Sequence, residues 1–401
     1  MGDAASGLSE LLRGGKYLAM LQSHLSSLQS AYGHGNRRLH LDDLLCTYLL
    51  CFFNPTLRSL RTISDWSHLA HQQGHLQMRR LCRSTLSDAN ALMDARLLVP
   101  ILRHLRSQLP QLRRQDPDLQ RLLEKVLIVD GSFFDAAADI AFALQSRTRG
   151  PKRSHQVRLD VHLEASTLLP CRLIVQGKGK SESKSLLENI EPAAIYVMDR
   201  AYTNFELLSL ILARGSDFLL RVKESIRFDS REEQVLDETD RLAGVLSDQT
   251  GELPGSPHSW KHLPRQMLRE VVIADEHHPE KPIRLLTSLL DVPAGLIAQL
   301  YRYRWQIELF FRWLKVHANF RHLISHSKNG MSLGFHAALI AVLLMYLKTK
   351  RPLSKYAFNL LSFVASGYAT MEQILPILEA REQECERDRQ RQKRRSKTKT
   401  R

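Results

Sequence analysis

The sequence predicts an α/β fold with a helical region before it and a β-rich interruption within it. Apolar residues recur every three or four positions through residues 1–120, which is the period of amphipathic helices. From residue 121, short β-branched runs such as "KVLIVDGSFF" and "AAIYVMD" alternate with helical stretches. Strands that alternate with helices indicate a mixed sheet with a parallel component, flanked by helices.

Composition favours a soluble protein with a polyanionic partner. The 401 residues are 43% hydrophobic and 25% charged, which is typical of a folded chain. They include 57 Lys and Arg against 42 Asp and Glu, a net charge of +15. Such a balance makes nucleic acid the leading partner, but many soluble proteins carry excess basic residues without binding it. Charge alone leaves both readings open.

The cysteines and the N-terminus indicate an intracellular protein. The chain has no C-x-x-C pair, so neither a zinc site nor a disulfide framework is predicted. Its opening, "MGDAASGLSELLRGGK", lacks the apolar segment of a signal peptide. The most apolar stretch, residues 335–347, is too short to span a bilayer and predicts a buried core helix. The five cysteines, expected to be reduced and mostly buried, are Cys46, Cys51, Cys82, Cys171 and Cys385.

The helical region, residues 1–120, contains a pair of helices that could bind DNA. "TLRSLRTISDWSHLAH" predicts one, and "DANALMDARLLVPILRHLRSQL" predicts the other, with Ser84 and Ser87 as candidate N-caps. A helix-turn-helix and a plain helical bundle with a solvated basic face both fit this pattern. The basic residues expected near its surface are Arg58, Arg61, Arg79, Arg80 and Arg83.

Residues 121–223 read as three strands, a helix, a strand, a helix and a strand. The second strand, "HQVRLDVHLEAS", alternates apolar and polar residues, so one of its faces is expected to be half-exposed. We assign no chemistry to the polar residues of that face. They are Arg158, Asp160, His162 and Glu164.

The remaining chain is read in four parts. Residues 224–296, rich in Pro, Gly and charges, predict a β-rich insertion. One long helix then runs through Glu308, and the helix at 335–347 is followed by another at about 353–366. Residues 389–401 hold eight basic residues and no acid. We expect this tail to be disordered, and either to contact phosphate backbones or simply to aid solubility.

Two aspartates follow directly on buried-type strands. Asp130 comes after "VLIV" and Asp199 after "IYVM". Side chains at the carboxyl ends of such strands point into the crevice where α/β sheets bind ligands. If the strands are neighbours, the two carboxylates repel unless a cation joins them, and oxygen ligands select Mg²⁺ or Mn²⁺. Each aspartate taken alone is more commonly explained as a turn former or helix cap.

A third acid stands on the long helix. Helical spacing puts Tyr301, Arg304, Glu308 and Lys315 in one stripe, so a carboxylate would lie beside cations that suit phosphate oxygens. The alternative is a surface helix with a weak Arg304–Glu308 ion pair. The expected buried face of the helix comprises Leu296, Leu300, Tyr303, Ile307, Phe310 and Leu314.

These residues resemble a known family. The pattern Y-x2-R-x3-E-x6-K, formed by Tyr301, Arg304, Glu308 and Lys315, is similar to the signature of bacterial insertion-sequence transposases with a DDE triad and a ribonuclease H-like fold. "IVDGSFFDA" resembles the strand of the family's first aspartate, and "YVMDRAYTNFELL" resembles its D-R-G-Y segment, with Ala201 in place of the usual glycine. The resemblance covers about residues 40–350.

The resemblance implies a domain plan. Residues 1–120 would form the DNA-binding region, and residues 121–223 with 297–350 the ribonuclease H-like catalytic core. The β-rich insertion would occupy 224–296, a helical C-terminal region 351–388 and the basic tail 389–401.

The resemblance also implies site residues. Asp130, Asp199 and Glu308 would be the catalytic acids and would bind two Mg²⁺ ions, for which Mn²⁺ could substitute. The residues implied to contact DNA are Tyr301, Arg304 and Lys315, together with Arg200, Tyr202 and Trp260. Trp260 is a candidate to stack on a flipped base, although a tryptophan packed in a small β-core is the more common explanation.

The function implied is cut-and-paste transposition. The protein would bind terminal inverted repeats in double-stranded DNA, cleave at the element ends and join the 3′ ends to target DNA. It would act as a homodimer on DNA in the bacterial cytoplasm, associated with the nucleoid, with no membrane partner. Two alternatives stay open: a related nuclease without strand transfer, and an inactive or domesticated derivative that only binds DNA.

Overall fold

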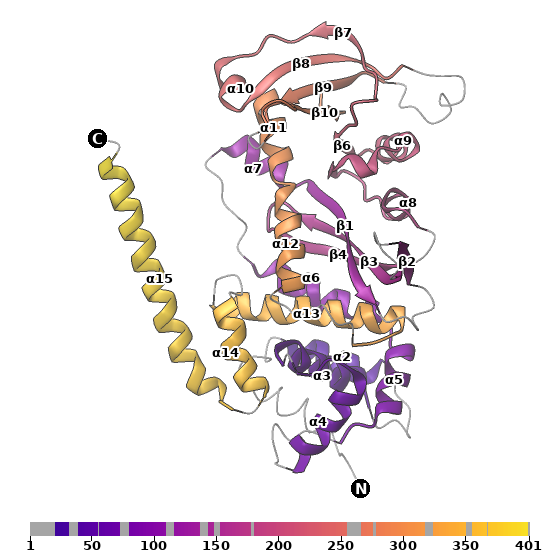
Figure 1. Cartoon of the computed structure of the whole chain (residues 1–401), viewed down its shortest axis with the longest axis vertical. Coiled ribbons are helices and arrows are strands. Elements are labelled where there is room, and N and C mark those ends of the chain that lie inside the picture. The colour runs from indigo at the N-terminus through magenta and orange to yellow at the C-terminus, as the bar shows by residue number, and fades with distance from the viewer. Residues whose placement is uncertain are drawn as a thin grey trace. The chain divides into compact units, whose positions relative to one another are not determined.

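The computed structural model divides the chain into two compact units (Figure 1). The helical unit comprises Met1–Gln108 and Trp313–Arg401, and the sheet unit comprises Leu109–Arg312. The structure describes residues 21–31, 39–54, 56–72, 80–109, 116–136, 143–147, 153–177, 180–254, 266–275, 278–316, 324–349, 355–366 and 368–399.

The helical unit is built around one apolar helix, α13 (Lys328–Thr349), which packs against α3, α5 and α6. The other helices of this unit are α2 (Gln22–Ser30), α3 (Leu41–Phe53), α4 (Leu60–Gln72), α5 (Arg83–Leu92), the short 3₁₀ helix η3 (Ala95–Leu98), α6 (Val99–Ser107), α14 (Lys355–Ala365) and α15 (Met371–Lys399). The predicted domain plan therefore differs from the structure at this point. Residues 328–349, expected in the catalytic core, belong to the helical unit.

The apolar helix α13 is longer than the predicted segment 335–347. It is the one described helix that is long and apolar enough to cross a membrane, over Lys328–Leu347. However, 78% of that segment is buried inside the protein. A helix that is apolar on all sides belongs inside a protein core or a membrane, and its packing against α3 and α6 accounts for this one as the centre of a helical bundle.

The first predicted DNA-binding helix corresponds to α4, and the second is divided in the structure among the end of α5, which contacts α4, and η3 and α6. The hydroxyls of Ser64 and Ser67 fix the chain ahead of α5 by hydrogen bonding to the backbone of Leu81. The predicted N-caps are wrong, because Ser84 and Ser87 lie inside α5, and Cys82 occupies the cap position without a side-chain hydrogen bond. Arg58, Arg61, Arg80 and Arg83 are exposed, whereas Arg79 lies outside the described residues.

The basic tail is helical in the structure rather than disordered, because α15 continues to Lys399. Its sequence from Glu379 contains no Pro or Gly and is rich in Glu, Arg, Gln and Lys, which are strong helix formers. Ion pairs three residues apart, Arg381–Glu384 and Arg391–Asp388, add modest support.

The sheet unit contains one mixed sheet in which ten described strands take part. They are β1 (Val126–Ala136), β2 (Leu144–Arg147), β3 (Arg153–Glu164), β4 (Leu169–Gln176), β5 (Ile195–Met198), β6 (Asp217–Arg221), β7 (Asp229–Glu233), β8 (Val245–Glu252), β9 (Leu268–Ile273) and β10 (Ile283–Thr287). The order is β2-β3-β1-β5-β6-β10-β9-β8-β7, and β4 also pairs with β3. Strands β1, β5 and β6 are parallel neighbours, while β3 runs antiparallel to β1 and to β4.

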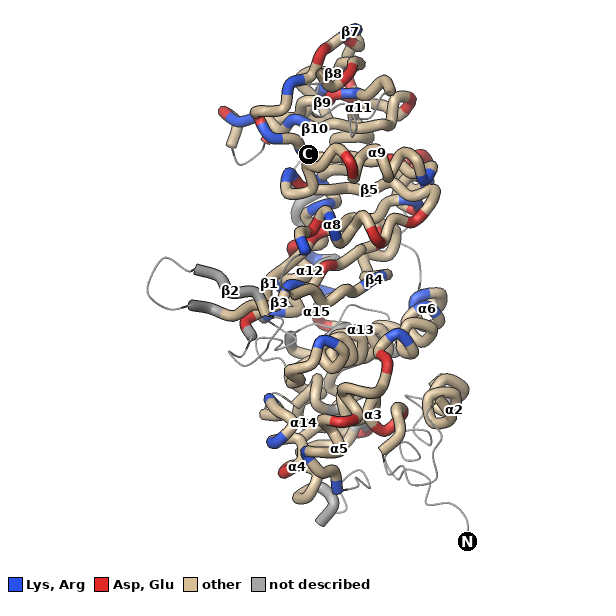
Figure 2. Tube along the Cα trace, turned by 90° about the vertical axis from the view of Figure 1, so that its right-hand side faces the viewer, with Lys and Arg blue, Asp and Glu red and all other residues tan. Residues whose placement is uncertain are grey.

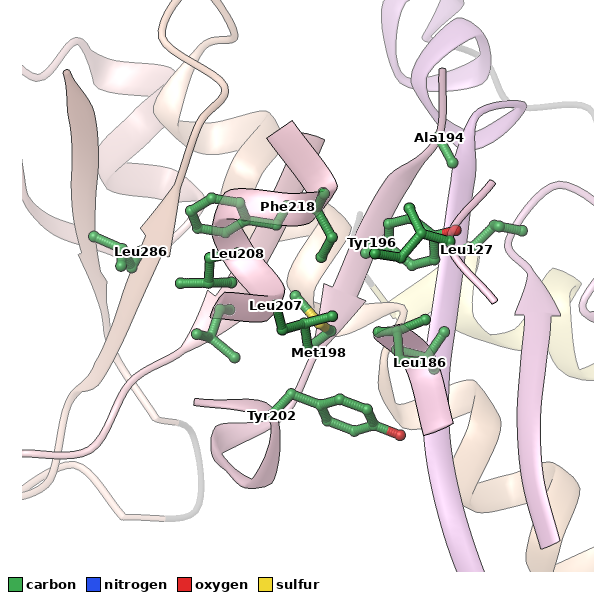
Figure 3. Close-up of a cluster of buried hydrophobic side chains, with 14 of the residues drawn as sticks. Leu127, Leu186, Ala194, Tyr196, Met198, Tyr202, Leu207, Leu208, Phe218 and Leu286 are labelled. Atoms are coloured by element: carbon green, nitrogen blue, oxygen red, sulfur yellow. The ribbon is translucent and has the colours of Figure 1, made fainter. Parts of the chain in front are cut away.

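Helices lie on both sides of the strands. The helices of this unit are α7 (Pro117–Leu123), α8 (Glu182–Leu187), the 3₁₀ helix η4 (Arg200–Tyr202), α9 (Phe205–Ala213), α10 (Glu238–Leu242), α11 (Ala294–Arg302) and most of α12 (Trp305–Val316). Leu186 of α8 and Leu207 and Leu208 of α9 pack on Tyr196 and Phe218 of the strands (Figure 3). Helices α7 and α11 lie on the opposite side (Figure 1). Burial on both faces explains the continuous apolar runs of β1 and β5.

The segment 224–296 extends the same sheet. Its strands β7 to β10 add to the edge of β6 through a run of antiparallel pairs. Acidic and basic residues are interspersed along this extension (Figure 2). All five residues of β7 are exposed, and four of them are charged. Charges on an edge strand oppose pairing with another chain, so they protect this edge of the sheet.

Candidate active site

Asp130 and Asp199 lie at the same level of two adjacent parallel strands. The register pairs Val126 with Ile195 and Ile128 with Val197, a difference of 69 in residue number, as between the two aspartates. Asp130 is within β1, and Asp199 directly follows β5 at the cap position of η4. Because side chains alternate along a strand, continuing this register puts both carboxylates on one face of the sheet.

The pKa of Asp130 depends on the charges of the other two predicted acids. The pKa of Asp130 is raised to about 6, mainly because the carboxyl is buried. The charges of Asp199 and Glu308 raise it further. The hydrogen bond that Asp130 Oδ1 accepts from the Gly131 N–H, at 2.8 Å, and the charge of Arg304 act in the opposite direction. Asp199 and Glu308 are therefore within electrostatic reach of Asp130.

The predicted long helix is wrong, because the chain turns tightly between α11 and α12 at residues 303–304. The Arg304 N–H donates to the Tyr301 carbonyl at 3.0 Å, and the Gln306 N–H to the Tyr303 carbonyl at 2.9 Å. These bonds span three residues instead of four, which tightens the chain as in a 3₁₀ turn. The turn changes which side chains of α11 and α12 point into the core.

The shifted face can be read from burial. Ile297, Tyr301 and Phe311 are buried, whereas the sequence predicted Leu296, Tyr303 and Phe310, which are only half-buried. Of the predicted face, Leu300, Ile307 and Leu314 are buried. A single continuous helical period cannot describe both sides of the turn.

Arg304, at this turn, links the acids to Tyr301. Its Nη1 lies 2.8 Å from Glu308 Oε1, and its guanidinium lies over the Tyr301 ring, 5.7 Å from the centroid. Tyr301 is only 5% exposed. The Tyr301 hydroxyl and Arg304 Nε are buried, and neither has a hydrogen-bond partner among the described residues. Lys315 stands half-buried two turns beyond Glu308 on α12.

The donor chemistry suits a divalent cation. Asp199 Oδ1 is buried without a hydrogen-bond partner among the described residues, which is costly for a carboxylate unless something else satisfies it. Carboxylate oxygens are the ligands that Mg²⁺ and Mn²⁺ prefer. In the described ranges, no three His, Cys, Asp or Glu side chains lie close enough together to hold one metal ion. Glu308 Oε1 is engaged by Arg304.

Comparison with known proteins identifies the family. Residues 121–344, more than half of the chain, match the family described as "Transposase DDE domain". The chain belongs to this transposase family. A transposase of Sinorhizobium fredii is 28% identical over 263 residues, 65% of this chain and 69% of the relative. The insertion sequence IS5377 transposase of Geobacillus stearothermophilus is 27% identical over 173 residues, 42% of this chain and 44% of the relative.

One solved structure is also similar to this chain. It is the cryo-EM structure of the piggyBac transposase synaptic complex with hairpin DNA, with a TM-score of 0.41 and 12% identity. The match covers 90% of this chain and 79% of that chain. The family and its relatives make this protein a DNA transposase of the bacterial insertion-sequence type.

Three further predicted DNA contacts of the transposase have different outcomes. Arg200 is exposed in η4, where its side chain is accessible. Tyr202 is only 2% exposed, and its ring belongs to the hydrophobic cluster with residues of α8 and α9 (Figure 3), so its contact with DNA phosphates stays a prediction. Burying its aromatic ring in the core stabilises the fold more than exposing the ring to solvent would. Trp260 lies outside the described residues.

Sequence reasoning missed a buried polar group next to Asp130. Arg158, Asp160 and His162 are 4%, 3% and 2% exposed, so the predicted half-exposed face of β3 is wrong. Strand β3 is central, with β1 on one side and β2 and β4 on the other, and α8 follows β4. Arg158 and Asp160 tolerate burial because they neutralise each other in an ion pair of 2.5 Å. Spacing within β3 gave no signal of this, since the partner segments are distant in sequence.

Proposed function

We propose that this transposase binds terminal inverted repeats, cleaves DNA at the element ends and joins the 3′ ends to target DNA. Asp130, Asp199 and Glu308 are the proposed catalytic acids. The observation that carries the proposal is the placement of Asp130 and Asp199 in register on adjacent parallel strands, with the charge of Glu308 acting on Asp130. Local structure does not explain why acids from three separate elements lie near one another. Such clusters of acids are typical of functional sites.

The proposed core is ribonuclease H-like. Its strands are β4-β3-β1-β5-β6, in which β3 alone runs against the others. The parallel part places the carboxyl ends of β1 and β5 side by side, where α/β sheets bind ligands. Helix α12 brings Glu308 from a segment beyond the extension β7–β10.

The acids are proposed to hold two Mg²⁺ ions, with Mn²⁺ as a substitute. When bound, such ions activate the attacking water or 3′-hydroxyl and stabilise the leaving oxygen of an in-line phosphoryl transfer. Asp130 and Asp199 supply oxygens from the sheet. Glu308 would supply its carboxylate after leaving Arg304. Its contact with Arg304 supports this proposal, because the same movement would leave the Arg304 guanidinium available to a phosphate anion.

Arg304 is proposed to bind a DNA phosphate oxygen once Glu308 has left it. A planar guanidinium suits two phosphate oxygens at once. Its stacking on the buried ring of Tyr301 fixes its direction. Lys315 and the exposed Arg200 are proposed to contact the backbone nearby.

The helical unit is proposed to recognise the repeats through α4 and α5. Arg58, Arg61 and Arg83 are exposed there and suit phosphate contacts, which position a protein on DNA. The transposase is proposed to act as a homodimer on DNA, with one copy at each element end. Contacts from the basic helix α15, and stacking of Trp260 on a flipped base, stay predictions.

A cleavage and joining assay tests this function. Full-length protein, Mg²⁺ and DNA carrying the element's ends should give nicks at those ends and joined products. D130N and D199N should each lower both reactions by about 10³-fold or more, because each removes an essential acid. D135N, at an exposed aspartate of the same strand, should behave like the wild type. DNA binding measured by gel shift should survive in all variants.

The same assay separates the alternatives. Precleaved ends bypass the first cut, so joining of such ends distinguishes a transposase from a nuclease. Cleavage without joining would favour the nuclease. DNA binding with neither reaction, and with no difference between wild type and D130N, would leave only the DNA-binding derivative.

A further inference from the structure

Helix α11 leads into the segment that bears Arg304 and Glu308, and it packs on the extension of the sheet. Its neighbours there are α10, β8 and β9, and α7 also contacts it (Figure 1). Tyr301 lies in its last turn, and two residues separate its end from α12, which carries Glu308. Arg304 is one of these two residues. So short a connection transmits any tilt or shift of α11 to Arg304 and Glu308.

The start of α11 is capped by a side chain from another helix. Its own cap residue, Pro293, makes no side-chain cap hydrogen bond, and its first turn contains no acid. Asp240 of α10, only 8% exposed, accepts a hydrogen bond from the Gly295 N–H through Oδ1 at 2.7 Å. Asp240 Oδ2 accepts from the Asp237 N–H at 3.3 Å. One carboxylate therefore joins the starts of α10 and α11, where free N–H groups and the helix dipole favour a negative charge.

The two helices are also joined at the other end of α11. Arg302 Nη2 donates to the backbone carbonyl of Ala243, which directly follows α10, at 2.8 Å. The approach at the start of α11 is close, because a Cβ on Gly295 would lie 3.2 Å from Asp240 Oδ1 and 3.3 Å from the Ala243 Cβ. Helix α10 thus contacts both the first and the last turn of α11. A helix held at both ends can neither tilt nor slide freely.

Strand β9 holds the chain that enters α11. Arg269, whose charge is neutralised by Asp248 of β8, donates from Nη1 to three backbone carbonyls of this connection. The extension therefore fixes the entry to α11, its first turn and its last turn. All of these contacts lie within the sheet unit, which also contains Tyr301, Arg304 and Glu308.

We propose that the extension positions the catalytic segment, and that Asp240 is a positioning residue of the transposase. By fixing α11, it would set where Tyr301, Arg304 and Glu308 stand relative to the strand aspartates. The inference rests on the proposed function of these residues. The competing explanation is that Asp240 contributes only to the stability of the fold.

Single-turnover cleavage by the full-length protein separates positioning from stability. The substrate is DNA carrying the element's ends, with Mg²⁺ and saturating protein, at a temperature well below the Tm of every variant. D240A should lower the rate constant by roughly tenfold or more, since small displacements of catalytic groups are costly. Its DNA affinity in gel shifts should stay within about twofold of the wild type, because a folded protein keeps its DNA contacts.

Two matched variants accompany D240A. D240N keeps an oxygen that can accept from the Gly295 N–H, and Asn caps helices about as well as Asp, so its rate constant should recover to within about threefold of the wild type. E238A removes an exposed acid of the same helix and should cleave normally. A D240N as slow as D240A would contradict a role for the hydrogen bond to α11.

Hydrogen exchange measured by mass spectrometry gives a readout that does not depend on activity. In D240A without DNA, peptides from α11 and the start of α12 should exchange faster, whereas those from β1 and β5 should be unchanged. Faster exchange throughout the sheet unit would establish the stability explanation. Unchanged exchange in α11 would also reject the positioning role. Should D240A not fold, G295A, which retains Asp240 but places a methyl group against it, supplies the same readouts.

D130N distinguishes the failure of this inference from that of the proposed function. If D130N is inactive and D240A cleaves at the wild-type rate, the positioning role is rejected and the proposed active site stands. If D130N itself cleaves like the wild type, the proposed active site fails.

Discussion

Two buried arginine–aspartate pairs of the sheet unit share their chemistry and differ in their surroundings. Arg158 and Asp160 lie two residues apart on β3, and their side chains are each 5% exposed. Arg269 of β9 and Asp248 of β8 are 7% and 3% exposed. Both arginines contact both oxygens of their aspartate.

The difference lies in what surrounds each pair. Arg269 Nη1 also donates to the backbone carbonyls of Leu289, Leu290 and Val292, which ties the chain after β10 to the extension. Beside Arg158 stands Glu182, an acid whose pKa is raised to about 7, and the neighbouring strand β1 carries Asp130, whose pKa is raised to about 6. A buried ion pair alone therefore marks structure. Acids left uncompensated beside such a pair indicate a functional site.

Removing the aspartate from each pair should give the largest difference in stability between the two regions. D248A leaves Arg269 charged and buried with carbonyls only, so the free energy of unfolding should fall by about 3–5 kcal/mol. D160A should lower it by only about 1–3 kcal/mol, because the Glu182 carboxylate stands next to Arg158 and can replace Asp160. Urea unfolding followed by circular dichroism measures both values.

The double variant D160A/E182Q is the control for this compensation. Without the second acid, the loss of stability should rise to that of D248A, and the excess over the two single variants measures the coupling. Equal losses for D160A and D248A would contradict the claim that the two surroundings differ.

Substitution of one glycine in each region sharpens the contrast. A Cβ at Gly251 of β8 would lie 2.1 Å from the backbone oxygen of Asp229 on β7, so G251A must separate the two strands and should cost about 1–3 kcal/mol. A Cβ at Gly131 meets only side chains, those of Glu182, Asp160 and Arg158. Side chains can move, so G131A should cost less stability than G251A, and urea unfolding of the two variants measures the difference. Equal losses would contradict the distinction between a backbone contact and a side-chain contact.

The sequence allowed the strands of the site to be predicted, but not their neighbours. Asp130 and Asp199 could be chosen because each ends an apolar run, and this property is local. Their pairing depends on a register with a difference of 69 residues, which no local pattern specifies. Glu308 was found through the spacing Y-x2-R-x3-E-x6-K, although the turn at 303–304 has no Pro or Gly to signal it.

The missed residues have a physical reason in common. The alternation in β3 is the pattern of a strand with one solvated face, yet Arg158 and Asp160 are buried. Their mutual neutralisation makes the polar face compatible with burial, and this depends on the geometry of the pair. Glu182 approaches through the space left at Gly131, a contact across 51 positions of sequence. Periodicity describes one element at a time and does not detect such contacts.

The smallest expected effect is a pH dependence of stability near the acids. In the folded protein without cation, the pKa of Glu182 is raised from 4.5 to about 7. A raised pKa means that its proton stabilises the fold below the unfolded value, and that this contribution is lost as the pH rises through about 7. The buried His162, whose pKa is lowered to about 3 mainly by burial, acts in the opposite direction between pH 3 and 6.5. Asp130, whose pKa is raised to about 6, acts in the same direction as Glu182, so the absolute Tm mixes the three groups.

The difference in Tm between E182Q and wild type isolates Glu182, because His162 and Asp130 are present in both. Near pH 5 the wild-type carboxyl is protonated in the fold, and Gln resembles it, so the two Tm values should be close. At pH 8 the wild-type carboxylate is ionised beside Asp130 and Asp199, so E182Q should be more stable by roughly 2–4 °C. The control E188Q, at an exposed acid of the same loop and helix that pairs with Lys180, should show no such growth with pH. A constant difference for E182Q across this range would mean that Glu182 is compensated in the fold, as Asp248 is by Arg269.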